Sequence, residues 1–131
     1  MFMTSAEGKT IGHDIFDTSI LIEYSRGNET IESKENYCFN SIVQMEFLVG
    51  ARNKKELRYL QQMLCDFQLI ETDQKILDLS VQLIEQYTLS HDMSVYDAII
   101  ATTCLVYDLP LWTLNIKDFR YIDDLQLFNK H

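Results

Sequence analysis

The chain has 131 residues, the length of one ordinary domain, and it can bury a core without disulfides or a structural metal. An apolar fraction of 47% and a charged fraction of 24% exclude a disordered composition. Twenty acidic and eleven basic residues give a net charge of −9, the reverse of the usual nucleic-acid binder, so a phosphate-bearing ligand would require a bound cation.

The cysteines and the chain ends indicate a cytoplasmic protein. Cys38, Cys65 and Cys104 form no CxxC pair and have apolar neighbours, which predicts buried free thiols in a reducing compartment. No apolar run is long enough to span a membrane, and the N-terminus lacks the pattern of a signal peptide. We expect residues 1–10 to be a polar tail and residues 11–131 to be a single domain.

Strands and helices are predicted to alternate along the chain. Residues 11–16 are a strand candidate, and Asp17 begins a helix that Gly27 ends. A loop over 29–36 leads to a strand at 37–40, and Ser41 opens the next helix, with Gln44 at capping-box spacing and Gly50 near its end. The later elements are a helix with the stripe Leu57, Leu60 and Leu64, a strand at 67–70, an amphipathic helix from Ile76 to Tyr87, a polar connection at 88–92, a helix from Ser94 to about Tyr107, and strands at 111–113 and 125–128. This order predicts an α/β fold, a three-layer α/β/α sandwich with a mainly parallel central sheet.

Four acidic residues fall where ligand sites form in such sheets. Open α/β sheets bind ligands at the carboxyl ends of their strands, and a helix running back along a strand begins at that same edge. The four residues are Asp17, Glu46, Asp97 and Asp118. Three of them also have a purely structural explanation: Asp17 as a helix N-cap, Asp97 in a capping pair with Ser94, and Asp118 as an ordinary turn residue.

Glu46 is harder to explain structurally. It is the only charged residue of its predicted helix, and its neighbours Met45 and Phe47 are apolar. This pattern predicts a desolvated carboxylate, which is costly unless it is paired or bound to a cation. The alternative is an internal ion pair with Arg52 or Arg58.

Carboxylates brought together repel one another unless a cation compensates them. Their hard oxygen ligands favour one or two Mg²⁺ or Mn²⁺ ions, which can activate water and stabilise charge on a phosphodiester. The sequence therefore predicts metal-dependent hydrolysis.

Four segments together resemble the PIN-domain nucleases, specifically the bacterial VapC-like toxins. They are Phe16 to Ile22 around Asp17, Ser41 to Ala51 around Glu46, Tyr96 to Thr103 around Asp97, and Trp112 to Phe119 with Asn115 and Asp118. The resemblance covers most of residues 11–122. It implies endonucleolytic cleavage of RNA that leaves a 5′-phosphate, ions held by Asp17, Glu46, Asp97 and the 115–118 turn, a partner antitoxin and a homodimer.

The resemblance also assigns supporting roles. The family often has Asp where this chain has Asn115, so Asp118 is expected to hold the metal directly or through another group, and Asn115 to orient metal-bound water. Thr18 and Thr113 either contribute hydroxyl groups to the site or form hydrogen bonds in the core. An antitoxin is expected to contact a hydrophobic groove beside the site.

Three alternatives stay open. The most basic stretch of the chain either contacts RNA phosphates or is a solvated helix face; its residues are Arg52, Lys54, Lys55 and Arg58. A strand ending in Asp17 is also similar to the nucleophile strand of haloacid-dehalogenase phosphatases, although Ser19 stands where their second Asp is needed. Finally, a PIN fold without turnover could serve as a binding module for an antitoxin or RNA, but the presence of all four acids favours activity.

Overall fold

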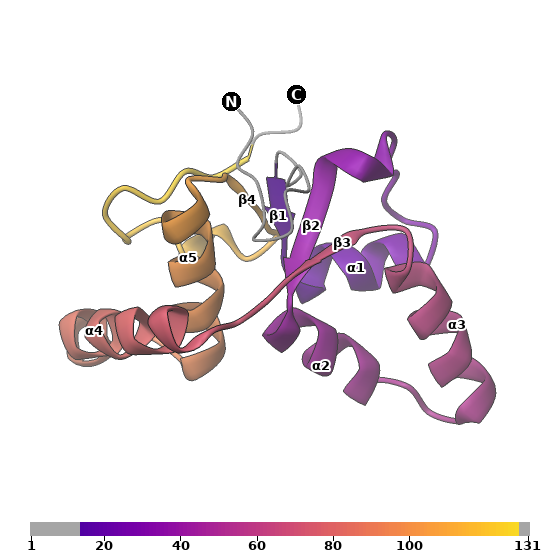
Figure 1. Ribbon diagram of the computed structural model, residues 1–131, viewed down its shortest axis with the longest axis horizontal. Coiled ribbons are helices and arrows are strands. Elements are labelled where there is room, and N and C mark those ends of the chain that lie inside the picture. Colours follow the sequence, from indigo (N-terminus) through magenta and orange to yellow (C-terminus); the bar gives the residue numbers. More distant parts are fainter. Residues whose placement is uncertain (1–13, 129–131) are drawn as a thin grey trace.

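Short parallel strands form the centre of this computed structural model, which describes residues 14–128. Figure 1 shows helices on both sides of the sheet, with α4 and α5 on one side and α1 and α3 on the other. The strands are β1 (Asp14–Phe16), β2 (Tyr37–Asn40), β3 (Gln68–Ile70) and β4 (Leu111–Trp112). The helices are α1 (Thr18–Ser25), α2 (Ser41–Val49), α3 (Lys54–Leu64), α4 (Gln74–His91) and α5 (Val95–Tyr107), with short 3-10 helices η1 (Lys34–Asn36) and η2 (Ile116–Asp118).

The sheet has the order β3-β2-β1-β4, and all three neighbouring pairs are parallel. The predicted α/β fold with a parallel sheet is therefore confirmed. The strand expected at 125–128 is reduced to a single bridge between Leu127 and Leu111, because the chain pairs with β4 at only that position. The predicted tail at 1–10 and the first part of the predicted strand at 11–16 lie outside the described residues.

Within residues 14–128, each of the five α-helices begins at a polar side chain that accepts a hydrogen bond from an amide of the first turn. These N-caps are Asp17, Asn40, Asn53, Asp73 and Ser94. The starts predicted at Asp17 and Ser94 are confirmed. The helix α2 begins at Ser41 as predicted, but its cap is Asn40, so the predicted capping box of Ser41 and Gln44 is wrong.

The end of α4 differs from the prediction. Residues 88–91 were expected in a polar connection, but α4 continues through His91 and ends at Asp92, which adopts a left-handed conformation with φ 55°. The last turn is polar because it faces water on one side, while Tyr87 and His91, four residues apart, both contact the Tyr121 ring.

The core gathers around β1, whose Ile15 and Phe16 are fully buried. The Phe16 ring meets the Phe67 ring edge-on with centroids 4.8 Å apart. Cys38 and Cys104 are buried as predicted, whereas Cys65 is exposed, because it caps the end of α3 on the solvent side. Within residues 14–128, no helix is long and apolar enough to cross a membrane.

Candidate active site

Asp17 follows β1 directly and is only 4% exposed. One carboxylate oxygen, Oδ1, accepts hydrogen bonds from the backbone amide of Ser19 at 3.1 Å and from the Ser19 hydroxyl at 2.5 Å. The other oxygen, Oδ2, accepts from the hydroxyl of Thr113 at 2.5 Å. The Asp17 carboxylate is thus held in a fixed orientation at the carboxyl end of β1, between the β1–α1 turn and the segment after β4.

The same hydroxyl groups tie the segment after β4 to this turn. The backbone amide of Leu114 donates to Ser19 Oγ at 3.0 Å, and that of Asn115 donates to Thr113 Oγ1 at 2.9 Å. Burial raises the pKa of Asp17, and the hydrogen bonds from Ser19 and Thr113 offset part of that rise. An ionised Asp17 is therefore costly here unless positive charge is added nearby.

Asp97 lies in the first turn of α5, where its amide donates to Ser94 Oγ at 3.1 Å. The predicted capping interaction is therefore present, but it does not account for the electrostatics of the side chain. Partial burial raises the pKa of Asp97 from 3.8 to about 6, opposed by the Ser94 hydrogen bond and reinforced by the negative charges of Asp118, Asp17 and Glu46. Asp97 thus interacts electrostatically with the other three predicted acids, which come from three separate segments.

Asp118 and Asn115 belong to the η2 turn, and both are exposed. Asp118 lines a cavity of about 360 Å³ together with Asp97. Asn115 contacts the Asp17 network through its backbone amide, while its side chain makes no capping hydrogen bond. The structure therefore brings Asp118 beside Asp97 and leaves the Asn115 side chain at the surface.

The predicted burial of Glu46 is wrong. Glu46 is exposed; of its apolar neighbours, Phe47 is buried, but Met45 is 53% exposed and Val49 is 83% exposed. Nor does Arg52 neutralise Glu46, because Arg52 pairs with Glu56 at 2.9 Å. Glu46 instead lies at the rim of a cavity of about 430 Å³ between α1, α2 and α3, close enough to Asp97 to raise its pKa.

Asn40 is a residue of the site that sequence reasoning missed. It is fully buried, its Oδ1 accepts from the Val43 amide at 3.0 Å, and its Nδ2 donates to Thr103 Oγ1 at 3.1 Å. Asn40 therefore caps α2, which carries Glu46, and bonds it to α5, which carries Asp97. The signal in the sequence was an amide residue at the end of a buried strand.

The two threonines of the predicted site behave differently. The Thr113 hydroxyl donates to Asp17 and accepts from Asn115, so its hydrogen-bonding capacity is used at the site. The Thr18 hydroxyl is buried and has no hydrogen-bond partner within the described part of the chain. Thr113 thus orients Asp17, whereas Thr18 makes no comparable contact.

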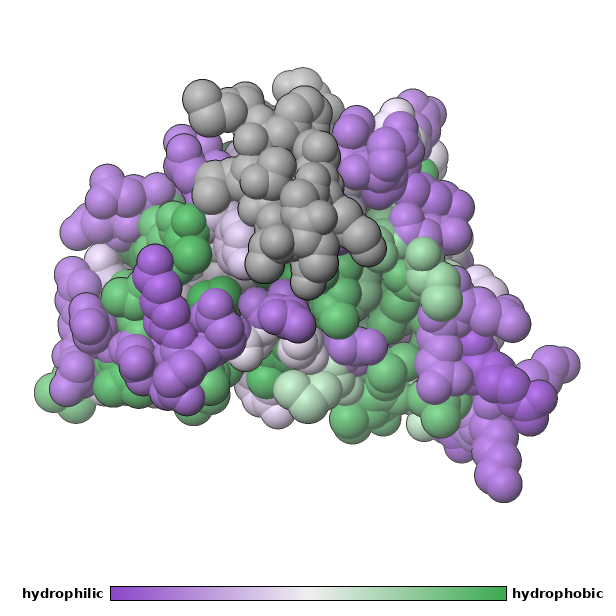
Figure 2. All heavy atoms as spheres, viewed as in Figure 1, coloured by the Kyte–Doolittle hydropathy of each residue, from purple (hydrophilic) through white to green (hydrophobic). Residues whose placement is uncertain are grey.

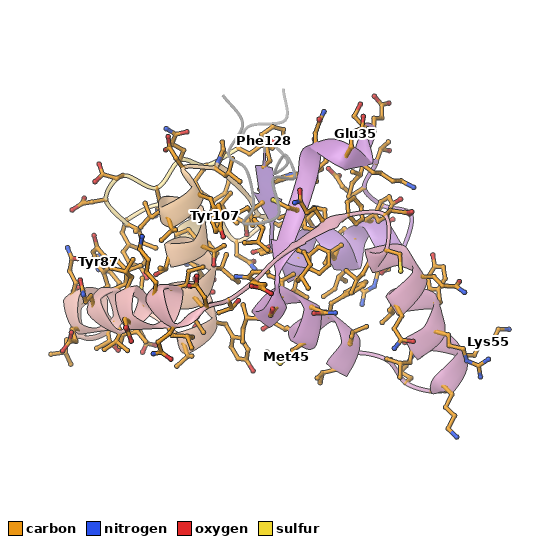
Figure 3. The ribbon with its side chains drawn as sticks, in the orientation of Figure 1. Glu35, Met45, Lys55, Tyr87, Tyr107 and Phe128 are labelled. Carbon is orange, nitrogen blue, oxygen red and sulfur yellow. The ribbon has the colours of Figure 1, made fainter. Side chains whose placement is uncertain are left out.

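The basic stretch from Arg52 to Arg58 forms the start of α3. Arg52 is engaged with Glu56, and Lys54, Lys55 and Arg58 are exposed. Figure 3 places Lys55 at the outer end of α3, on the opposite side of the molecule from Tyr87 in α4. These features match the solvated-helix alternative, although the ion pair joins Arg52, which precedes α3, to Glu56 in its first turn.

The donor set fits a divalent cation of the Mg²⁺ type. Among residues 14–128, the salt bridges of basic side chains are with Glu23, Asp66 and Glu56, so none of the four acids has a basic partner. In the same part of the chain, no three His, Cys, Asp or Glu side chains are grouped so that they could hold a metal ion together. Magnesium commonly takes only one or two protein carboxylates and keeps several waters, so it does not require three of these side chains to converge.

Comparison with known proteins adds to this geometry. A family model described as "PIN domain" matches residues 15–125. A protein named ribonuclease VapC from Rickettsia bellii is 30% identical over 124 residues, which cover 86% of this chain and 92% of that protein. A protein named ribonuclease VapC1 from Methanocaldococcus jannaschii is 27% identical over 122 residues, covering 88% of this chain and 87% of its own length.

Solved structures with the same fold are also found. A chain of a toxin-antitoxin complex from Klebsiella pneumoniae aligns with a TM-score of 0.68 at 28% identity, covering 86% of this chain and 94% of that chain. A chain of DNA-bound VapBC from Salmonella typhimurium aligns with a TM-score of 0.76 at 19% identity, covering 90% of this chain and 98% of that chain. The second likeness concerns the fold alone.

Proposed function

This chain belongs to the PIN-domain family, and on that premise we propose that it is a metal-dependent endoribonuclease that hydrolyses RNA and is the toxin of a toxin–antitoxin pair. The observation that carries the proposal is the convergence of four acids from separate segments: burial raises the pKa of Asp97, and the charges of Asp118, Asp17 and Glu46 raise it further. Carboxylates that act on one another without a basic partner favour a divalent cation. The names of the similar proteins, ribonuclease VapC, supply the substrate class.

The chain's own residues divide into fixed and movable groups. Asp17 is buried and held by Ser19 and Thr113, and Asp97 is held at the start of α5, so these two would fix the position of the ions. Glu46 and Asp118 are exposed and would close around them. When bound, one or two Mg²⁺ or Mn²⁺ ions supply a water of lowered pKa and positive charge for the scissile phosphate.

The experiment is cleavage of mixed-sequence RNA by antitoxin-free protein with Mg²⁺ or Mn²⁺, with EDTA, and with Asp17→Asn or Asp97→Asn. We expect cleavage that requires the metal and falls at least about a hundredfold in each variant. The control is Asp78→Asn, which should cut normally because it changes an exposed acid of α4 whose carboxylate accepts a hydrogen bond from the Gln74 side chain. Folded wild-type protein that binds RNA but does not cut it with either metal would instead support the binding-module alternative.

An antitoxin would find apolar surface beside the acids. The cavity between α1, α2 and α3 is lined by Glu46, Phe47 and the exposed Tyr59, and Met45 and Val49 are exposed on α2. Figure 2 shows hydrophobic atoms at the surface over α2, and Figure 3 shows Met45 on its outer side. Exposed apolar patches of this kind are typical of protein interaction sites. We propose that the antitoxin covers this surface.

This part of the proposal has its own test. Val49→Asp should weaken co-purification with the cognate antitoxin by at least about tenfold, because it places a charge in an apolar interface. The matched control is Leu89→Asp, since Leu89 is 99% exposed on α4. Equal losses in both variants would contradict the assignment of the surface.

We also propose a cytoplasmic homodimer, which light scattering of the antitoxin-free protein would detect as twice the chain mass.

A further inference from the structure

The cavity of about 360 Å³ that contains Asp97 and Asp118 has a second set of walls that the proposed chemistry does not use. Besides Asp92, its walls include Lys117, Arg120, His91 and Tyr121. The cavity therefore joins two of the proposed metal-binding acids to two cations and two rings.

Lys117 and Arg120 are cations without a salt-bridge partner in the part of the chain that the structure describes. Arg26, Lys34 and Arg52 each pair with a carboxylate, but Lys117 and Arg120 do not, although they flank Asp118. Both side chains are exposed. In a chain of net charge −9, two unpaired cations beside the acids are the groups best placed to bind a phosphate.

The two rings form a fixed flat surface. The His91 imidazole lies parallel to the Tyr121 ring, with centroids 4.0 Å apart and an interplanar angle of 4°. Tyr87 packs edge-on against Tyr121 at 5.1 Å, and Ser90 Oγ lies 2.8 Å from His91 Nδ1. His91 is exposed, so the imidazole offers a held aromatic face to solvent. Nucleic-acid bases stack on such faces regardless of sequence.

We propose that this cavity binds the RNA nucleotide next to the scissile phosphodiester, with its phosphate on Lys117 and Arg120 and its base stacked on His91. The assignment rests on the proposed ribonuclease function. It explains how an acidic protein can hold a polyanion: the two cations line the same cavity as Asp97 and Asp118, while Lys55 of α3 lies on the opposite side of the molecule from Tyr87 of α4 (Figure 3). The partner is single-stranded RNA, because only an unpaired base is free to stack.

The test measures binding separately from cleavage. Anisotropy of a fluorescein-labelled, mixed-sequence single-stranded RNA is followed in Ca²⁺, with cleavage in Mn²⁺ assayed in parallel. Lys117→Gln/Arg120→Gln should weaken binding about tenfold and lower the slope of log affinity against log salt by about one. The control, Lys34→Gln/Lys75→Gln, removes the same charge elsewhere, from the partly exposed Lys34, which pairs with Asp66, and from the exposed Lys75, and should change affinity by less than about twofold.

The stacking surface is tested by two variants of one residue. His91→Ala should weaken RNA binding about tenfold, whereas His91→Phe, which keeps the ring and lacks the imidazole nitrogens, should stay within about twofold of wild type. Thermal unfolding of each variant checks that the fold is intact. A His91→Phe loss equal to that of His91→Ala would overturn stacking.

Different results would overturn the nucleotide subsite and the ribonuclease function on which it rests. If the Lys117/Arg120 variant binds like its control while the wild-type chain cuts RNA, the subsite is wrong and the ribonuclease stands. If the wild-type chain does not cut but its RNA binding depends on Lys117, Arg120 and His91, the subsite stands and the ribonuclease is wrong. Absence of RNA binding by the wild-type chain overturns the subsite.

Discussion

Asp97 is half-buried at the start of α5, and its pKa lies at about 6 rather than 3.8. Because this pKa is above that of the unfolded chain, the fold binds the proton more tightly than the unfolded state does. The resulting stability is fully present below about pH 4 and is lost as the pH rises through about 6. At neutral pH the ionised Asp97 therefore opposes folding of the metal-free protein.

Asp97→Asn should remove this penalty. In EDTA at about pH 7 we expect the free energy of unfolding to rise by about 1 kcal/mol, less than the full pKa shift implies because Asp97 is partly exposed to water. The gain should vanish near about pH 4, where Asp97 is already protonated. Urea unfolding at both pH values measures it, with Asp78→Asn as the control. A variant less stable than wild type at neutral pH would contradict the electrostatic account.

Thr113 orients Asp17 through one hydroxyl, and Thr113→Val removes that donor while keeping the shape of the side chain. Groups that orient metal ligands typically change affinity or activity ten- to a hundredfold. We expect kcat to fall by about tenfold or more, with KM within about twofold and recovery in Thr113→Ser. The control is Thr102→Val, because the buried Thr102 hydroxyl has no partner within residues 14–128. Equal kcat in Thr113→Val and wild type would exclude a positioning role.

At the scale of the elements, Asn40 joins α2 to α5. The cap bond to Val43 and the bond to Thr103 are both buried, so replacing Asn40 removes two interactions that water cannot replace. The relative placement of Glu46 in α2 and Asp97 in α5 depends on these two hydrogen bonds of Asn40.

Asn40→Ala should cost about 2 to 3 kcal/mol of unfolding free energy, of which about 1 is the helix cap. The matched control is Asn53→Ala, which removes the cap of α3 at an exposed position and should cost only about 1 kcal/mol. Denaturant unfolding of the two variants isolates the buried bond to α5. Equal losses would mean that the link between α2 and α5 adds no stability.

The elements also show what the sequence could predict. Strand order along the chain and the helix starts at Asp17 and Ser94 follow from local patterns, which caps and alternation express directly. The predicted burial of Glu46 is wrong because its apolar neighbours lie on two faces of α2: Phe47 is buried, whereas Met45 and Val49 are exposed. Asn40 was missed because its partner Thr103 lies 63 residues away, and such contacts leave no local pattern. The polar end of α4 had the composition of a loop but continues as helix.

For the whole molecule, the net charge of −9 makes cation binding the event that prepares the protein for RNA. Mn²⁺ at about a hundred times its dissociation constant should raise the free energy of unfolding by about 2.7 kcal/mol. Thermal unfolding with Mn²⁺ or with K⁺ at equal ionic strength separates binding from screening. Asp17→Asn should lose most of the Mn²⁺ effect. An undiminished shift in that variant would place the ion at another site.

The most direct test of the central claim is the chemistry of the RNA ends after cleavage in Mn²⁺. Hydrolysis by an activated water at the Asp17 and Asp97 site predicts 5′-phosphate and 3′-hydroxyl ends, formed only while the metal is present and not after EDTA is added. Cleavage that continues in EDTA and leaves 2′,3′-cyclic phosphates would show attack by the RNA's own 2′-hydroxyl, and would contradict the metal-dependent mechanism.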